Sequence, residues 1–242
     1  MDSLSIVIPA YNEERRLPNT LKEILRWLSG PTPAFYEIIV VDDGSSDATV
    51  QFVAGFAKQH PCVRLLRNPG NRGKGYAIRH GMLEANGDWI LSSDADLSTP
   101  IEEVAKLHAA AMVQNAPIAI GSRAIDRSLV EIPQAAFREY SGRFFNIVMR
   151  LVTGLPYQDT QCGFKLFRKE AAREIFSRQK QDGFSFDVED LVIARKLGLQ
   201  AVEVPVRWRN AEGTKVSLSQ GIKSFVDLFQ IRADHRDTSG ER

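Results

Sequence analysis

Cysteine is scarce in this sequence, and no long apolar run interrupts it. The two cysteines, Cys62 and Cys162, are too few for a disulfide framework and lack the paired spacing of metal ligands. No apolar stretch approaches the ~18 residues that a membrane-spanning helix requires, and the N-terminus, Met1-Asp2-Ser3, lacks the basic region of a signal peptide. We therefore expect a protein of a reducing compartment that is soluble or attached to a membrane surface.

An excess of charge of either sign is also missing. The 242 residues include 31 Lys and Arg against 30 Asp and Glu, a formal net charge of +1. This balance gives no argument for a nucleic-acid partner, and any electrostatic binding site must be local. The composition, 43% hydrophobic and 25% charged, is that of one globular domain or a closely fused pair, and the length suffices for a sizeable core.

Apolar segments of two periodicities alternate along the chain. Runs typical of buried strands occupy residues 4–10, 36–41, 63–66, 89–91 and 118–120. Helical patterns lie between them at residues 17–28, 73–85 and 101–113, and Ser46 or Asp47 is the expected N-cap of a further helix that runs toward His60. This alternation predicts an α/β fold with a mostly parallel sheet that helices cover on both faces. In such sheets, ligands bind outside the carboxyl ends of the strands.

Two carboxylates, Asp94 and Asp96, follow the apolar run of residues 89–91 in the segment SSDADLSTP. A strand that ends in an Asp-x-Asp turn presents both carboxylates at the sheet edge, where they can hold a hard divalent cation against phosphate oxygens. This chemistry suggests an enzyme that uses a nucleotide sugar. Taken alone, the segment is equally compatible with a purely structural turn.

Further polar segments follow other predicted strands and lie at the same edge: residues 9–13, 42–45 and 121–123. Asp42-Asp43-Gly44 is also ordinary chemistry for a turn with a helix cap. Arg123 suits bidentate contact with phosphate, although it could be a common surface arginine. The segment NRGKG combines glycines, two cations and a helix N-terminus, which makes either an anion site or a simple basic loop. It is not a Walker motif.

The chain contains a succession of motifs over residues 4–230: VIPAYNEE, VVDDGSSD, NRGKGYAIRHGM, SSDADLSTP, GSRAI, DTQCGFKLF, FSFDVEDL and VPVRWRNAEGTKV. This succession resembles family 2 glycosyltransferases with the GT-A fold. Within that family it is most similar to dolichyl-phosphate β-glucosyltransferases and their bacterial polyprenyl-phosphate relatives. Dolichyl-phosphate mannose synthases share the early motifs, whereas DTQCGFKLF and the late W-x-x-x-x-G-T-K-V look more like the glucosyl branch.

The resemblance implies binding roles for particular residues. Four residues after the first two strands would hold the nucleotide: Pro9, Tyr11, Glu13 and Asp42. Asp94 would lie near the ribose and the metal, and Asp96 would bind Mg²⁺ or Mn²⁺ directly, where the cation assists departure of the nucleoside diphosphate. Arg123 and Lys74 would add positive charge there. Ser98 stands where related enzymes have a Gln in the metal shell, so the resemblance does not extend to that ligand.

The implied reaction is an inverting transfer of a hexose, glucose from UDP-glucose in this branch, to a polyprenyl or dolichyl phosphate. A phosphate monoester is already an anion near neutral pH and needs no general base. The enzyme must instead hold two anions together, which cations do. Candidates for the acceptor phosphate are Arg138, Arg143 and Arg207. Asp159 or Glu189 would steer the sugar hydroxyls or act as a base, and residues 187–190 also fit an acidic helix N-terminus.

Two segments bear on the lipid acceptor. Residues 135–152 are apolar around most of a helix, with Arg138, Arg143 and Arg150 interleaved, which is typical of an interfacial helix. A helix packed on the sheet or in a dimer is the alternative. Residues 218–232 also gather apolar side chains on one face. Dolichyl-phosphate glucosyltransferases carry a membrane helix before the catalytic domain, and many bacterial relatives carry two after it. Because this sequence shows neither, we expect a peripheral enzyme on the cytoplasmic face of the membrane.

We expect residues 1–232 to form a single catalytic domain, followed by a polar tail at residues 233–242. Alternative functions are a GDP-mannose-dependent mannosyltransferase, a family 2 glycosyltransferase with a soluble acceptor and, in a different class, a non-catalytic nucleotide-sugar binding module. The intact Asp94, Asp96 and Arg123 argue against the last of these. The sequence does not determine the oligomeric state.

Overall fold

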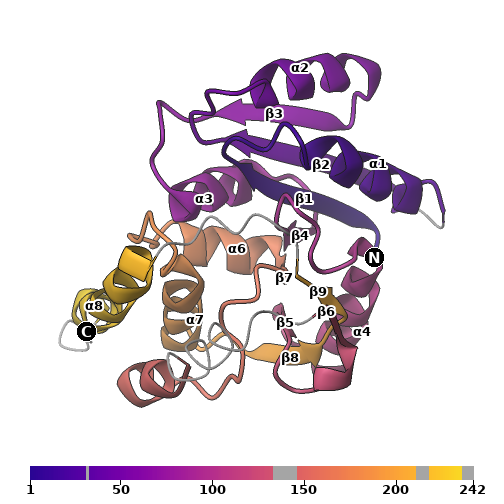
Figure 1. Cartoon of the computed structure of the whole chain (residues 1–242). Coiled ribbons are helices and arrows are strands. Elements are labelled where there is room, and N and C mark those ends of the chain that lie inside the picture. The colour runs from indigo at the N-terminus through magenta and orange to yellow at the C-terminus, as the bar shows by residue number, and fades with distance from the viewer. Residues whose placement is uncertain (31–32, 133–145, 211–217, 236–242) are drawn as a thin grey trace.

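A seven-stranded sheet with helices on both faces forms the centre of the molecule (Figure 1). The computed structural model describes residues 1–30, 33–132, 146–210 and 218–235. The strand order is β3-β2-β1-β4-β7-β5-β8, and β6 and β9 form a second sheet of two strands. The predicted α/β fold with a mostly parallel sheet is confirmed.

The first four strands form the parallel part of the large sheet. They are β1 (Ser3–Ala10), β2 (Phe35–Asp42), β3 (Val63–Arg67) and β4 (Trp89–Ser92). Alternate residues of β1 enter two cores, since Leu4 and Ile6 pack on one face of the sheet and Val7 packs on the other. Burial on both faces explains why these strands are near-continuous apolar runs in the sequence.

The other half of the sheet includes an antiparallel strand. β7 (Lys165–Arg168) lies between β4 and β5 (Ile118–Ser122) and is antiparallel to both, while β8 (Ala201–Pro205) pairs in parallel with β5. No predicted strand corresponds to β7. Because it runs in the opposite direction, the segment before it, residues 159–164, lies at the sheet edge where the parallel strands end.

Helices pack on both faces of the sheet, as predicted. α1 (Leu17–Leu28), α2 (Thr49–Gln59) and α4 (Val104–Gln114) contribute to one core. α3 (Lys74–Glu84), α6 (Lys169–Phe176), α7 (Phe186–Lys196) and α8 (Leu218–Asp234) contribute to the other. Smaller elements are 3-10 turns at Ile101–Glu103 and Arg127–Leu129, β6 (Val130–Ile132), β9 (Trp208–Arg209) and a helix at residues 146–153.

One helix begins later than its sequence pattern predicts. Ser46 and Asp47, the two expected N-cap residues of α2, lie in the loop before it, and the amide oxygen of Asn12 accepts their backbone N–H groups. Asp47 in turn accepts the backbone N–H of Thr49, the first helical residue. These local hydrogen bonds compete with the helix and tie the loop after β1 to the loop after β2.

Two predictions, the helix at residues 135–152 and the C-terminal tail, fall partly outside the described residues. Of the expected helix at residues 135–152, residues 146–153 are helical, and the part with Arg138 and Arg143 is not described. α8 extends to Asp234 and so includes the first two residues of the predicted tail at residues 233–242. Residues 236–242 of that tail are not described. Among the helices that the structure describes, none combines the length and apolar composition needed to cross a bilayer.

Candidate active site at the carboxyl edge of the sheet

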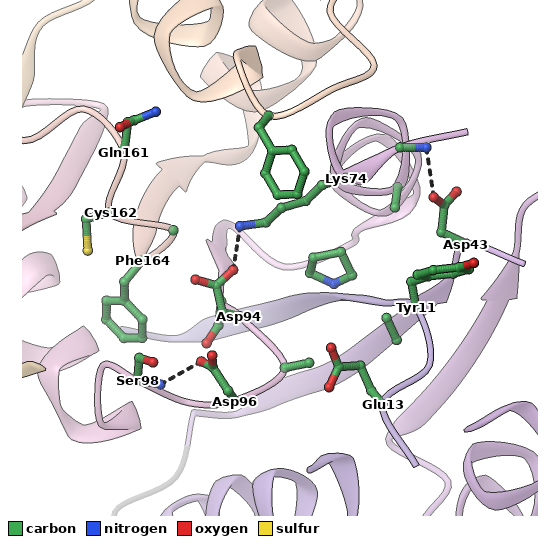
Figure 2. A pocket seen from close by; sticks show the side chains of 18 of the residues that line it. Tyr11, Glu13, Asp43, Lys74, Asp94, Asp96, Ser98, Gln161, Cys162 and Phe164 are labelled. Carbon is green, nitrogen blue, oxygen red and sulfur yellow. Dashed lines mark hydrogen bonds and ion pairs between the residues drawn. The ribbon is translucent and has the colours of Figure 1, made fainter. Parts of the chain in front are cut away.

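A pocket of about 920 Å³ opens at the carboxyl edge of the parallel strands. Each polar segment that the sequence placed at this edge contributes at least one residue to its lining. Figure 2 shows Tyr11 and Asp43 at one end of the pocket and Gln161 at the other, with Asp94 and Asp96 between them. The pocket therefore has an elongated shape with its acidic pair near the middle.

The turn that carries Asp94 and Asp96 is fixed by its surroundings. Ser98 donates its backbone N–H to the Oδ1 atom of Asp96 at 3.0 Å. Gly163, just before β7, passes so close that a Cβ atom there would lie 2.5 Å from the Oδ2 atom of Asp94. A side chain at position 163 would displace the carboxylate, so the Cys-Gly-Phe turn of the DTQCGFKLF motif serves to seat Asp94.

Cations surround the two carboxylates. The Lys74 Nζ atom lies 2.7 Å from the Oδ1 atom of Asp94, and an Arg16 nitrogen lies 3.8 Å from Asp96 (Figure 2 shows the Lys74 contact). Beneath them, the buried side chains of Lys165 and Asp187 form a direct ion pair. Asp94 and Asp187 thus each have a lysine in close contact, whereas the nearest cation to Asp96 is the more distant Arg16.

This arrangement separates the pKa values of the two carboxyl groups. Burial tends to raise the pKa of Asp94, but the charges of Lys74, Lys165 and Arg123 outweigh it and lower that pKa. For Asp96, burial and the neighbouring Asp94 carboxylate both raise the pKa above its ordinary value. The pKa of Lys74 is raised above its usual value, because Asp94 and Asp187 outweigh its burial.

Arg123 is held in the pocket by Asp159. Its backbone N–H, Nε and Nη2 groups donate to the Asp159 carboxylate at 3.0, 2.6 and 2.8 Å, and its guanidinium lies 5.5 Å from the centre of the Trp208 ring. Burial would raise the pKa of Asp159, but the Arg123 charge and hydrogen bonds lower it. The carboxylate is therefore an orienting partner of Arg123, and it does not itself line the pocket.

The end of the pocket near β1 and β2 contains Pro9, Tyr11 and Glu13. Glu13 is bonded to Arg16 at 2.6 and 2.8 Å. The structure does not place Asp42 in the lining. Asp42 is buried and accepts the backbone N–H groups of the Gly44 turn, because its side chain points toward its own loop.

Asp43 lines the pocket in place of Asp42 and was missed by the sequence analysis as a separate site residue. Its carboxylate accepts the backbone N–H groups of Arg72 and Gly73 at 3.0 and 2.8 Å. Strand alternation is the signal that separates the two aspartates, since Asp42 is the last residue of β2 and the next residue points the other way.

Glu189 and Arg207 lie outside the pocket lining. Glu189 is fully buried, and its carboxylate accepts the backbone N–H groups of Lys180 and Gln181 and contacts His235, which directly follows α8, at 2.7 Å. Arg207 forms a 2.6 Å ion pair with the buried carboxylate of Glu103. Both side chains have structural partners, and Arg138 and Arg143 fall in residues that the structure does not describe.

The donor chemistry of the pocket fits a hard divalent cation. Asp94 and Asp96 supply carboxylate oxygens, which Mg²⁺ and Mn²⁺ prefer. In the described ranges, no group of three or more His, Cys, Asp and Glu side chains is arranged to bind a metal. The remaining positions around an ion would therefore be filled by oxygens of a bound diphosphate and of water.

Comparisons with known proteins agree with this geometry. Residues 5–176 match the sequence profile of glycosyl transferase family 2. The chain is 43% identical to the dolichyl-phosphate beta-glucosyltransferase of Drosophila melanogaster over 94% of this chain and 74% of that protein. It is 39% identical to the dolichyl-phosphate beta-glucosyltransferase of Homo sapiens over 95% of this chain and 74% of that protein.

Solved structures show the same fold at lower sequence similarity. Glucosyl-3-phosphoglycerate synthase from Mycobacterium tuberculosis, in complex with Mn²⁺, uridine diphosphate and glucosyl-3-phosphoglycerate, superposes with a TM-score of 0.69. The two sequences are 18% identical, and the match covers 96% of this chain and 80% of the other. The resemblance stated from the motifs is confirmed, and the chain belongs to glycosyl transferase family 2 and, within it, to the dolichyl-phosphate β-glucosyltransferases.

Proposed function

We propose that this protein transfers glucose from UDP-glucose to a dolichyl or polyprenyl phosphate and inverts the configuration of the anomeric carbon. The observation that carries the proposal is the pairing of Asp94 and Asp96 with the cations Lys74 and Arg123 in one pocket. Family membership over nearly the whole chain supports the same reaction. A pocket that combines two carboxylates with two cations suits a diphosphate bound together with a divalent ion.

The donor would occupy the pocket along its length. Tyr11, Glu13 and Asp43 would lie beside the nucleoside, and Asp94 and Asp96 would hold Mg²⁺ or Mn²⁺ against the diphosphate. The bound ion would act as a Lewis acid on the departing nucleoside diphosphate. Arg123, oriented by Asp159, would place a second fixed positive charge on the same leaving group.

The acceptor phosphate would attack without a general base. A phosphate monoester carries about −1.5 to −2 charge near pH 7, so its oxygen is already nucleophilic. The two carboxylates considered as bases, Asp159 and Glu189, are bonded to Arg123 and to backbone N–H groups respectively. Their geometry favours roles in positioning Arg123 and the loop before α7, and neither needs to accept a proton.

Exposed apolar side chains on two neighbouring helices, which we call the apolar surface, suit a lipid acceptor. They are Ile147 and Leu151 on helix 146–153, and Val226 and Phe229 on α8. Arg232 of α8 donates to the backbone carbonyl of Val152 at 3.2 Å, so the two helices are neighbours. α8 also supplies Asp227 to the pocket lining. We propose that this surface lies in the cytoplasmic leaflet of a membrane, as a peripheral contact.

A comparison of donors and acceptors tests the proposed function. Purified protein is supplied with Mn²⁺, dolichyl phosphate in detergent and either UDP-glucose or GDP-mannose that carries a radiolabel in its sugar. After the reaction, the labelled lipid product is extracted into organic solvent and counted. We expect lipid-linked product from UDP-glucose and little from GDP-mannose. Product from GDP-mannose at an equal or higher rate would reassign the donor, and transfer only to a water-soluble phosphate would reassign the acceptor.

Binding without transfer is the remaining alternative. Should the protein bind UDP-glucose with Mn²⁺ but form no product with any tested acceptor, the non-catalytic binding module would be favoured. The same assay with EDTA separates metal-dependent transfer from background, since chelation should remove the reaction if the Asp94 and Asp96 site works through a divalent ion.

A further inference from the structure

Lys74 is the first residue of α3 and reaches the centre of the pocket from one side. Its position depends on Gly73, which has a φ of 116° and lies so close to the 182–183 backbone that a Cβ atom would meet the Asp182 carbonyl oxygen at 2.3 Å. The tight turn directs the Lys74 ammonium to within 2.7 Å of the Asp94 carboxylate. The ammonium thus contacts one of the two carboxylates that would hold the metal.

Lys74 and Arg123, two of the cations that line the pocket, differ in how firmly they are held. Arg123 makes three hydrogen bonds to Asp159 and lies over an aromatic ring, so its charge is fixed in place. Among the described contacts, Lys74 has one ion pair, with Asp94, at the end of a flexible four-carbon stem, and its ammonium lies 5.8 Å from the centre of the Phe186 ring. Asp187, another carboxylate near Lys74, is already paired with Lys165. Lys74 is therefore the cation that can move at low cost.

A divalent ion and the Lys74 ammonium cannot both sit against Asp94 without strong repulsion between like charges. A bound diphosphate offers the ammonium an alternative partner with several negative oxygens in the same pocket. If the ammonium moved to the diphosphate, Asp94 would be released for the metal. If the diphosphate then left, the ammonium would return and neutralise the Asp94 carboxylate.

We propose that Lys74 couples metal binding to nucleotide binding by exchanging between Asp94 and the diphosphate. This inference rests on the proposed function, because it assumes a divalent ion and a nucleoside diphosphate in the pocket. It requires that metal alone binds weakly, that nucleotide strengthens metal binding, and that metal strengthens nucleotide binding by the same factor. As a result of this exchange, the metal would stay bound at Asp94 only while a diphosphate is present.

The test is the affinity of Mn²⁺ with and without UDP, measured by electron paramagnetic resonance of free Mn²⁺. The variants are Lys74→Met and Lys74→Gln, the second of which keeps a hydrogen bond to Asp94 without the charge. Lys106→Met is the matched control, because Lys106 pairs with Glu103 and lies outside the pocket lining. Thermal unfolding of each variant verifies that it is folded.

For the wild type and for Lys106→Met, we expect UDP to tighten Mn²⁺ binding by about 5- to 150-fold, the usual range of coupling between two ligands. Lys74→Met and Lys74→Gln should bind Mn²⁺ alone more tightly than the wild type, with a smaller effect of UDP. The same coupling factor in wild type and both Lys74 variants would overturn the inference while leaving the proposed function intact. A wild type that binds neither Mn²⁺ nor UDP would overturn both.

Discussion

At the residue scale, neighbouring groups give three aspartates of the pocket region different properties. Asp159 is bonded to Arg123, which lowers the pKa of its carboxyl group and makes it an orienting anion. Asp94 shares its charge with Lys74. Asp96 has the Asp94 carboxylate beside it and only a distant arginine, and its pKa is raised. A pair of carboxylates whose negative charge is only partly balanced by nearby cations gains the most electrostatic stabilisation from a bound divalent cation.

The first prediction concerns Asp96. Replacement of Asp96 by Ala should lower kcat by roughly 100- to 1000-fold or more, because the leaving group loses several kcal/mol of electrostatic stabilisation. The free energy of unfolding should change by less than about 1 kcal/mol, since the lost contacts are one hydrogen bond and a 3.8 Å ion pair with Arg16 in a partly exposed turn. Initial rates with saturating UDP-glucose and urea denaturation measure the two effects. Glu102→Ala, at an exposed acid outside the pocket lining, is the control.

At the element scale, α7 places an unusual number of acids inside the protein. Asp187, Glu189 and Asp190 are all buried, and the first two have partners in Lys165 and in backbone N–H groups. Among the described residues, both oxygens of Asp190 lack a hydrogen-bond partner. Burial, with Asp187 next in importance, raises the pKa of Asp190 well above its ordinary value. The folded protein therefore keeps Asp190 protonated at pH values where the unfolded chain has lost the proton.

The second prediction follows from the sign of this difference. Because the native state binds the Asp190 proton more tightly than the unfolded chain, the contribution of Asp190 to the stability of the wild type falls as pH rises above the ordinary carboxyl pKa of 3.8. Asp190→Asn has no proton to lose, so it should gain stability relative to the wild type as pH increases. We expect a gain on the order of 1 kcal/mol between pH 5 and pH 8.

Urea unfolding at several pH values measures this gain. Glu174→Gln is the control, since Glu174 is an exposed acid that pairs with Arg178 one turn away. Its difference from the wild type should stay nearly constant over the same pH range. If Asp190→Asn lost stability relative to the wild type as pH rises, the assignment of a neutral Asp190 would be contradicted.

The third prediction concerns the two helices that carry the apolar surface. Leu151 and Phe229 are 78% and 62% exposed, and they belong to helix 146–153 and α8. If these helices lie in the lipid headgroup region, Leu151→Asp together with Phe229→Asp should weaken binding to anionic vesicles by tenfold or more, because apolar burial of about 1.5 to 3 kcal/mol per side chain is lost.

Flotation of the protein with vesicles of neutral lipid, and of neutral lipid mixed with phosphatidylserine, measures this binding. Added salt should weaken the binding to anionic vesicles, since basic residues near the surface contribute about 1 kcal/mol each. Val113→Asp on α4 is the matched control, because Val113 is 86% exposed on a different helix. If Val113→Asp weakened vesicle binding equally, or if the wild type did not bind vesicles, the apolar side chains of these two helices would not be a membrane contact.

At the scale of the whole molecule, the sequence predicts the fold better than it predicts individual contacts. Near-continuous apolar runs and period-3.6 patterns in residues 4–120 predicted the five strands β1 to β5 and the helices between them, and local signals there agree with the tertiary fold. β7 was missed because its residues pair in the opposite direction and include Lys165, a charge that only a buried partner on α7 makes tolerable.

The candidate site was predictable to the level of segments. Strand order brings the ends of β1, β2, β4 and β5 to one edge, so the convergence of their loops follows from topology. Which side chain of a loop enters the pocket depends on local hydrogen bonds, as the exchange of Asp42 for Asp43 shows. Glu189 and Arg207 acquire partners that lie distant in the sequence, His235 and Glu103, and the sequence gives no sign of these.

The fourth prediction concerns the stereochemistry of the complete reaction. A retaining mechanism by double displacement requires a carboxylate free to attack the anomeric carbon. Among the described residues of the pocket region, Asp94 and Asp96 form the proposed metal site, Asp159 is bonded to Arg123, and Asp43 accepts backbone N–H groups. The other carboxylates of the lining accept hydrogen bonds from side chains: Glu13 from Arg16, Asp182 from Arg79 and Asp227 from Ser185. Direct attack by the acceptor phosphate is then the available route, and it produces a β-linked glucosyl phosphate from an α-linked donor.

Proton NMR of the purified lipid product distinguishes the two outcomes through the coupling of the anomeric proton. A β-linkage is expected for the wild type. Asp159→Asn should give the same β-linked product at a reduced rate, because it disturbs the orientation of Arg123 and leaves the direction of attack unchanged. An α-linked product would require a nucleophile on the protein, and the direct displacement would then be wrong.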